Sequence, residues 1–139
     1  MSRTNRVKAT KTAYYHVVSR IANKAFLLVD DNAKRVLLNI LHRAAEFSGV
    51  DVATYVIMDN HFHLCIRVPE NKNIVSEAEV IRRVAVLYGE NYKNSFVNRL
   101  NDYKNANDME CAESMINKMR ARMGDLSEFM KTFKQRFSQ

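Results

Sequence analysis

Two histidines separated by a single residue, His61 and His63, are the side chains of this chain whose types and spacing best suit metal chemistry. On a β-strand, residues two apart project from the same face about 7 Å apart, so both imidazoles can bind one metal ion. The alternation continues over residues 61–68, where His, His, Cys and Arg fall on one face and Phe, Leu, Ile and Val on the other. This pattern predicts a strand with one face in a core and the other open for chemistry.

A simpler interpretation of the same pair is that His61 belongs to a turn, His63 is a surface imidazole and no metal binds. Several other catalytic motifs are missing from the sequence: His-Glu-x-x-His, Cys-x-x-Cys, a Gly-rich phosphate loop and a nucleophile elbow. ATP-driven and serine-hydrolase mechanisms are therefore not expected.

The composition is that of one globular domain. With 139 residues and 47% hydrophobic content, the chain is long enough to bury a core. No apolar run approaches the roughly 20 residues that span a bilayer, and the polar, basic start lacks the apolar segment of a signal peptide. The two cysteines, Cys65 and Cys111, have no metal or redox spacing, so we expect reduced thiols in a cytoplasmic protein.

The net charge of +7 is distributed unevenly. Residues 1–12 form a basic N-terminal arm without an acidic side chain, and a smaller positive excess lies near the C-terminus. Basic arms often contact phosphate backbones, although a solubilising terminus explains the same composition. The candidate DNA-contacting residues of these two regions are Arg3, Arg6, Lys8 and Lys11 in the arm, and Lys131 and Arg136 near the C-terminus.

Periodicity and capping residues predict the elements that position the histidines. Gly49 ends one helix, and Ser76 with Glu79 forms a capping box for the next. Asp59-Asn60 makes a tight turn between two strands. Residues 13–139 form one domain, in which the Asn-rich segment 90–108 is an insertion or a loosely held helical stretch. The predicted strands are 13–21, 50–58 and 61–68, and the predicted helices are about 30–48, 77–88, 109–123 and 126–137.

The order of these elements predicts an α+β, ferredoxin-like antiparallel sheet with helices on one face and its last strand missing. In that topology the first and third strands are neighbours. Alternation along the first strand then puts His16 and Arg20 on the same open face as the histidine pair. His16 is thus a candidate third metal ligand, and Arg20 and Arg67 are candidate phosphate contacts.

Three segments in sequence order resemble the single-tyrosine HUH transposases of insertion sequences, and among them the REP-associated tyrosine transposase-like group. HUH denotes His-hydrophobe-His, here His61-Phe62-His63. The segments are Tyr14–Arg20, Tyr55–Leu64 and Leu126–Phe137. Because their order and spacing extend the resemblance over about residues 13–69 and 125–139, it is far more specific than the tripeptide alone.

The resemblance implies metal-assisted cleavage and transfer of single-stranded DNA, usually beside a hairpin. In the family, two histidines and one further polar side chain hold Mg²⁺ or Mn²⁺ against the scissile phosphate, and the two histidines correspond here to His61 and His63. Imidazole suits Mn²⁺ better than Mg²⁺, which prefers oxygen ligands. A tyrosine attacks the phosphate, forming a 5′-phosphotyrosine and leaving a free 3′-hydroxyl, so resealing needs no nucleotide cofactor.

The chain departs from the family pattern at its C-terminal end. The family's nucleophilic tyrosine and third ligand follow the segment that resembles Leu126–Phe137, so we expect both beyond Gln139 and assign neither to a residue here. On this interpretation the chain is a truncated transposase, a fragment of a longer protein, or a catalytically inactive DNA-binding remnant.

Association with other molecules is expected at the sheet. An exposed sheet edge predicts a homodimer, and an aromatic stripe on the last helix either meets a partner or folds back onto the sheet. A more distant alternative, an RNA-binding ferredoxin-like domain, would stack bases on sheet aromatics, whereas the third strand offers His, Cys and Arg. No membrane association is expected. The aromatic stripe consists of Phe129, Phe133 and Phe137.

Overall fold

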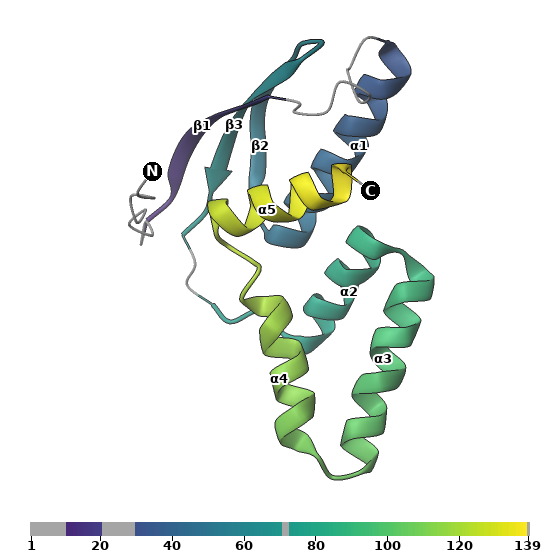
Figure 1. Ribbon diagram of the computed structural model, residues 1–139. Helices are drawn as coiled ribbons and strands as arrows, with labels where there is room; N and C mark the ends of the chain where they lie inside the picture. Colours follow the sequence, from purple (N-terminus) through teal and green to yellow (C-terminus); the bar gives the residue numbers. More distant parts are fainter. Residues whose placement is uncertain (1–10, 21–29, 71–72, 139) are drawn as a thin grey trace, which may run out of the picture.

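The computed structural model describes residues 11–20, 30–70 and 73–138, and shows a three-stranded antiparallel sheet with five helices (Figure 1). The predicted α+β class with an antiparallel sheet is therefore confirmed. The strand order is β1-β3-β2, so β1 and β2 are the sheet edges within the described part of the chain. The elements are β1 (Ala13–Arg20), α1 (Asp31–Ser48), β2 (Asp51–Ile57), β3 (His61–Val68), α2 (Glu77–Tyr88), α3 (Glu90–Asn105), α4 (Met109–Arg120) and α5 (Leu126–Phe137).

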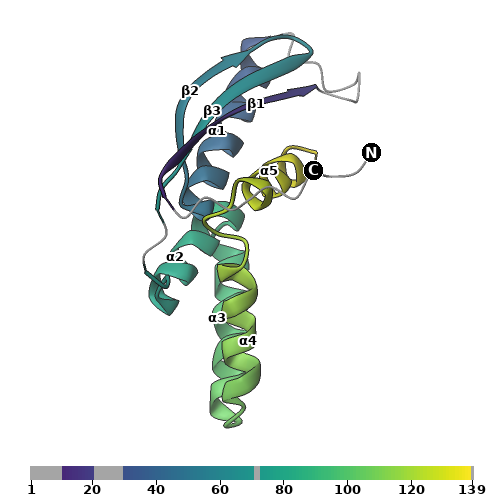
Figure 2. The same cartoon turned by 90° about the vertical axis from the view of Figure 1, so that its left-hand side faces the viewer.

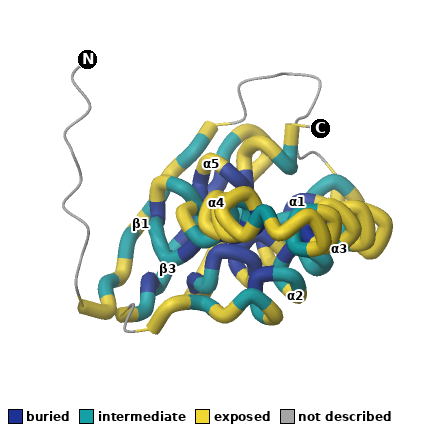
Figure 3. Tube along the Cα trace, turned by 90° about the horizontal axis from the view of Figure 1, so that it is seen from below, coloured by how far each residue is buried: buried dark blue, intermediate teal, exposed yellow. Residues whose placement is uncertain are grey.

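The central strand β3 alternates strictly between buried and partly exposed residues, as predicted. Phe62, Leu64 and Ile66 are buried and belong to the hydrophobic core, whereas His61 and His63 on the opposite face stay partly exposed. Buried residues gather between the sheet and the helices (Figure 3). The sheet thus has one face in the core and one face that none of the described helices covers.

Helices α1 and α5 lie against the core face of the sheet (Figures 1 and 2). Phe133 of α5 meets Phe62 of β3 edge to face, with ring centroids 5.5 Å apart. Phe129 stacks on Phe133 and both side chains are buried. The aromatic stripe of the last helix therefore folds back onto this sheet, which is one of the two outcomes that the sequence left open.

The predicted helix boundaries at Gly49 and Ser76 are confirmed. Gly49 follows α1 with φ 74°, a left-handed conformation that favours glycine. A Cβ at this position would lie 3.0 Å from Arg83 Nη1, so the glycine also leaves room for the Arg83 guanidinium. The Ser76 hydroxyl accepts a hydrogen bond from Glu79 N at 3.2 Å, which is the first half of the predicted capping box.

Helices α3 and α4 form a hairpin that extends away from the sheet (Figures 1 and 2). The Asn-rich segment is a regular helix over most of its length, with Phe96 and Leu100 buried. Asn107, in the connection to α4, has φ 55°, a conformation that asparagine tolerates well. Within residues 11–20, 30–70 and 73–138, no helix is both long and apolar enough to cross a membrane.

An ion-pair network centred on Glu79 ties α2 to α1. Glu79 accepts hydrogen bonds from Arg82 and Arg83, and Arg82 also pairs with Glu46 of α1 at 2.7 Å. The pKa of Glu79 is lowered from 4.5 to about 2, mainly by the hydrogen bonds from Arg82 and, as the second cause, by the hydrogen bond from Arg83. The folded state therefore stabilises the charged carboxylate.

This shift predicts a pH-dependent contribution of Glu79 to stability. A carboxylate with a lowered folded-state pKa stabilises the fold above pH 4.5, and the contribution is lost as the pH falls toward 2. We expect E79Q to lower the free energy of unfolding at pH 7 by up to about 1 kcal/mol, because the site is partly exposed. Urea unfolding at several pH values should show the two proteins converging in acid, and a gap that persists at pH 2 would contradict the assignment.

Candidate metal and nucleic-acid site

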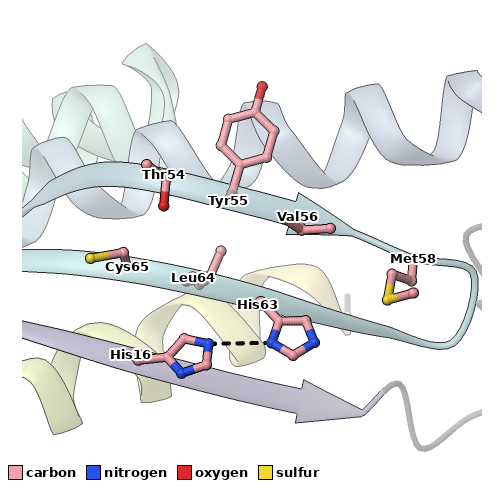
Figure 4. Close-up of a pocket in the computed structure, with 8 residues that line it drawn as sticks. All are labelled: His16, Thr54, Tyr55, Val56, Met58, His63, Leu64 and Cys65. Atoms are coloured by element: carbon pink, nitrogen blue, oxygen red, sulfur yellow. Dashed lines mark hydrogen bonds between the residues drawn. The ribbon is translucent and has the colours of Figure 1, made fainter.

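Strands β1 and β3 bring three histidines together on the uncovered sheet face. The antiparallel register pairs His16 with Cys65, Val18 with His63 and Arg20 with His61. His16 is thus a diagonal neighbour of His63, and its Nε2 lies 3.2 Å from His63 Nδ1 (Figure 4). The predicted proximity of His16 to the histidine pair is confirmed.

The rings of His16 and His63 meet edge to edge. Their planes are inclined by only 13° and their centroids lie 5.4 Å apart. This separation is close to the 3.2 Å N···N distance plus the two ring radii, so the two nitrogens lie nearly on the line between the centroids. The two imidazoles therefore form a nearly flat, hydrogen-bonded pair.

His61 begins β3 and has a different partner. Its Nδ1 lies 2.6 Å from Oδ1 of Asn60, a residue of the turn between β2 and β3. Its ring is 5.2 Å from that of His63, centroid to centroid, with the planes inclined by 67°. The turn itself is tight, as predicted, with Met58 N donating to His61 O at 2.9 Å.

A shallow hollow of 380 Å³ opens on this face beside His16 and His63 (Figure 4). Side chains of β2 and of the turn after it border the hollow, and two of them, Val56 on β2 and Met58 in the turn, are exposed hydrophobic residues. Tyr55 belongs to the same stretch of β2 but points away from the two histidines (Figure 4). The hollow therefore combines imidazole nitrogens with exposed apolar surface.

The two arginines predicted to contact phosphate differ in their surroundings. Arg67 forms an ion pair with Asp51 of β2, with Nη1 2.5 Å from Oδ2. Arg20 is exposed beside His61, and no ion pair of Arg20 is found in the described part of the chain. Arg20 can therefore bind a phosphate directly, whereas Arg67 would first have to break its ion pair with Asp51.

The basic residues near the C-terminus lie in the helix layer rather than on the histidine face. Lys131 is exposed on α5. Arg136, also on α5, lies over the ring of Tyr88, with its guanidinium carbon 5.1 Å from the centroid. In the arm, Lys11 is exposed. The remaining arm candidates, Arg3, Arg6 and Lys8, lie outside the described residues.

Two histidines of this face are candidate metal ligands. No group of three or more His, Cys, Asp or Glu side chains suited to one metal ion occurs among the described residues. His61 and His63 are nevertheless adjacent imidazoles, and each has one ring nitrogen, Nε2, outside the hydrogen bonds described above. Two imidazoles fit a transition-metal ion that takes its remaining ligands from other groups.

Residues 9–107 match the family described as "Transposase IS200 like". The matched stretch includes all three strands, the histidine pair and helices α1 to α3. Comparisons with curated proteins and with solved structures found no match.

Proposed function

Because the chain belongs to the IS200-like transposase family, we propose that it binds single-stranded or hairpin DNA across the uncovered face of its sheet. The observation that carries this proposal is the gathering of three histidines and Arg20 on that face. Proteins that bind single strands combine cations for the backbone with flat or apolar side chains for the bases. Exposed Tyr14, Val18 and Val56 supply such side chains around the histidines.

We propose further that His61 and His63 hold the divalent metal that the family uses. Bound there, Mg²⁺ or Mn²⁺ would neutralise and orient a phosphate as a Lewis acid, and the imidazole donors favour Mn²⁺. Arg20 would bind the same strand through a neighbouring phosphate. We propose additional electrostatic contacts from the remaining basic candidates, which are Lys131 and Arg136 on α5 and Arg3, Arg6, Lys8 and Lys11 in the arm.

Family chemistry adds strand cleavage through a phosphotyrosine, and this step is proposed without an assigned nucleophile. Tyr14 shares the histidine face and is 64% exposed, but it does not match the family position. The competing candidate is a DNA-binding remnant without cleavage activity. Its support is that the described residues offer two adjacent metal-site imidazoles but no complete three-ligand group.

One experiment separates these candidates. A DNA hairpin with a single-stranded flank, labelled at its 3′ end, is incubated with the protein and Mn²⁺ and then run on a denaturing gel. A 5′-phosphotyrosine would leave the label on the protein, and the Y14F variant would show whether Tyr14 carries it. Salt-sensitive DNA binding without a covalent adduct would favour the inactive remnant. If the protein bound duplex DNA as tightly as single-stranded or hairpin DNA, the proposed function would be refuted.

Substitution of Arg20 tests the location of the DNA. We expect R20A to weaken binding uniformly across DNA sequences and to lower the slope of log K against log salt by about one. R43A removes an exposed arginine from α1 in the helix layer, and serves as the matched control. Equal losses in the two variants, measured by fluorescence anisotropy over a salt series, would argue against the sheet face.

We also propose that the protein forms a homodimer. In the described part of the chain, β1 and β2 each have one neighbour in the sheet, and an unpaired strand edge is a surface on which a second chain can pair. Sedimentation of the protein at several concentrations would test this, and a monomer at all of them would contradict it.

A further inference from the structure

We infer that Asn60 and His16 are positioning residues that fix the ring tautomers of His61 and His63, an inference that rests on the proposed metal site. Each histidine of the pair has its Nδ1 next to a polar atom of another side chain: Asn60 Oδ1 at 2.6 Å for His61, and His16 Nε2 at 3.2 Å for His63. Histidines that bind metal commonly donate their other ring N–H to such a partner, which fixes the tautomer and the ring orientation.

For His61 the direction of the hydrogen bond is set by chemistry. A carboxamide oxygen accepts hydrogen bonds and cannot donate, so the hydrogen must be on Nδ1 of His61. Neutral imidazole carries one ring hydrogen, which leaves the Nε2 lone pair for a metal ion. The neighbouring Asp59 pairs with Lys34 of α1 at 3.5 Å, so the turn that carries Asn60 is itself tied to the helix layer.

For His63 the partner is a second imidazole, which can donate or accept. If His16 donates, His63 must carry its hydrogen on Nε2 and cannot bind metal through either nitrogen while the hydrogen bond persists. If His63 donates from Nδ1, its Nε2 is free and the Nε2 lone pair of His16 is occupied. Metal binding at His63 therefore selects the second arrangement, in which His16 supports a ligand instead of being the third ligand.

The geometry of the pair also holds the His63 ring in place. Because His16 and His63 meet edge to edge with planes only 13° apart, the hydrogen bond resists rotation of either ring. Both supporting groups are uncharged acceptors, unlike the carboxylates often found in this role. Neither Asn60 nor His16 would neutralise the positive charge of a bound cation, so that charge would remain available to attract a phosphate.

The first test is made on the metal-free protein. Long-range ¹H–¹⁵N correlation spectra of the histidine rings distinguish protonated from unprotonated nitrogens. We expect His61 to carry its hydrogen on Nδ1 in the unmodified chain and to lose this preference in N60A. N60D keeps an acceptor oxygen and should restore it. A hydrogen on Nε2 of His61 in the unmodified protein would overturn the inference even if metal binds.

The second test measures Mn²⁺ affinity by isothermal titration calorimetry. We expect N60A and H16A each to bind Mn²⁺ about 10–100-fold more weakly, as for other partners of metal-binding histidines. N60D and H16Q, which retain acceptor oxygens, should recover most of that loss. His42 is exposed on α1, and H42A should leave the affinity unchanged.

The possible failures are distinguishable. Unchanged affinity in folded N60A and H16A, or no recovery in N60D and H16Q, would overturn the positioning roles while leaving the proposed metal site intact. Failure of the unmodified chain to bind Mn²⁺ would contradict the metal site itself. Far-ultraviolet circular dichroism of each variant confirms that the comparison is between folded proteins.

Discussion

Replacing His63 by alanine is expected to cost more Mn²⁺ affinity than any other single substitution on the sheet face. The side chain is one of the two proposed protein ligands, and it is also the partner of His16. Its loss should therefore exceed the roughly 10–100-fold effect of removing an outer partner. DNA binding that depends on Mn²⁺ should fall in parallel, whereas the part of binding that is independent of metal should remain.

Calorimetry and anisotropy on the same preparations check this expectation. If both imidazoles are ligands, H61A should also lose more Mn²⁺ affinity than removal of an outer partner does, although less than H63A. H42A removes an exposed histidine outside the site and serves as the control. If H63A kept the affinity of the unmodified protein while H61A lost it, His63 would be a neighbour of the site and not a ligand.

The second large effect is expected for α5, the helix that packs against the core face of the sheet. We expect F133A to lower the free energy of unfolding by about 3–5 kcal/mol, the range for truncating a buried phenylalanine. Phe133 is 1% exposed and lies between Phe62 of the sheet and Phe129 of its own helix. Losing it would leave a cavity where α5 joins the sheet, and urea unfolding measures the cost.

Two matched variants show whether the effect belongs to this contact. Phe137, one turn later on α5, is only partly buried, so F137A should cost clearly less. F133L keeps most of the apolar volume and should also cost less than F133A. If F133A and F137A were equally destabilising, α5 would not be held to the sheet mainly through Phe133.

Much of the fold could be predicted because single residues determine it locally. The strict alternation along β3 needs no tertiary information, and neither do the capping roles of Gly49 and Ser76. Helix α3 was harder to predict, since only Phe96 and Leu100 of its residues are buried. A helix in a protruding hairpin packs on few neighbours, so its apolar stripe is narrow and its periodicity weak.

The candidate site could be predicted only in part, and the surroundings of Arg67 show why. A register shift between Val52 and Thr54 brings Asp51 opposite Arg67. Uninterrupted alternation from Thr54 would have placed Asp51 one position further along β3, on the other face. The ion pair between Arg67 and Asp51 thus depends on a β-bulge that no sequence pattern predicts. The hydrogen bond of Asn60 to His61 likewise depends on a side-chain conformation within the turn.

We propose that the uncovered face of the sheet is the metal-binding and DNA-binding surface. Titration of ¹⁵N-labelled protein with substoichiometric Mn²⁺ tests it most directly, because a bound paramagnetic ion broadens the amide signals around it. We expect the signals of His16, His61 and His63 to disappear first while those of the α3–α4 hairpin persist. Broadening centred on the exposed carboxylates Glu110 and Glu113 of α4, or no selective broadening at all, would contradict it.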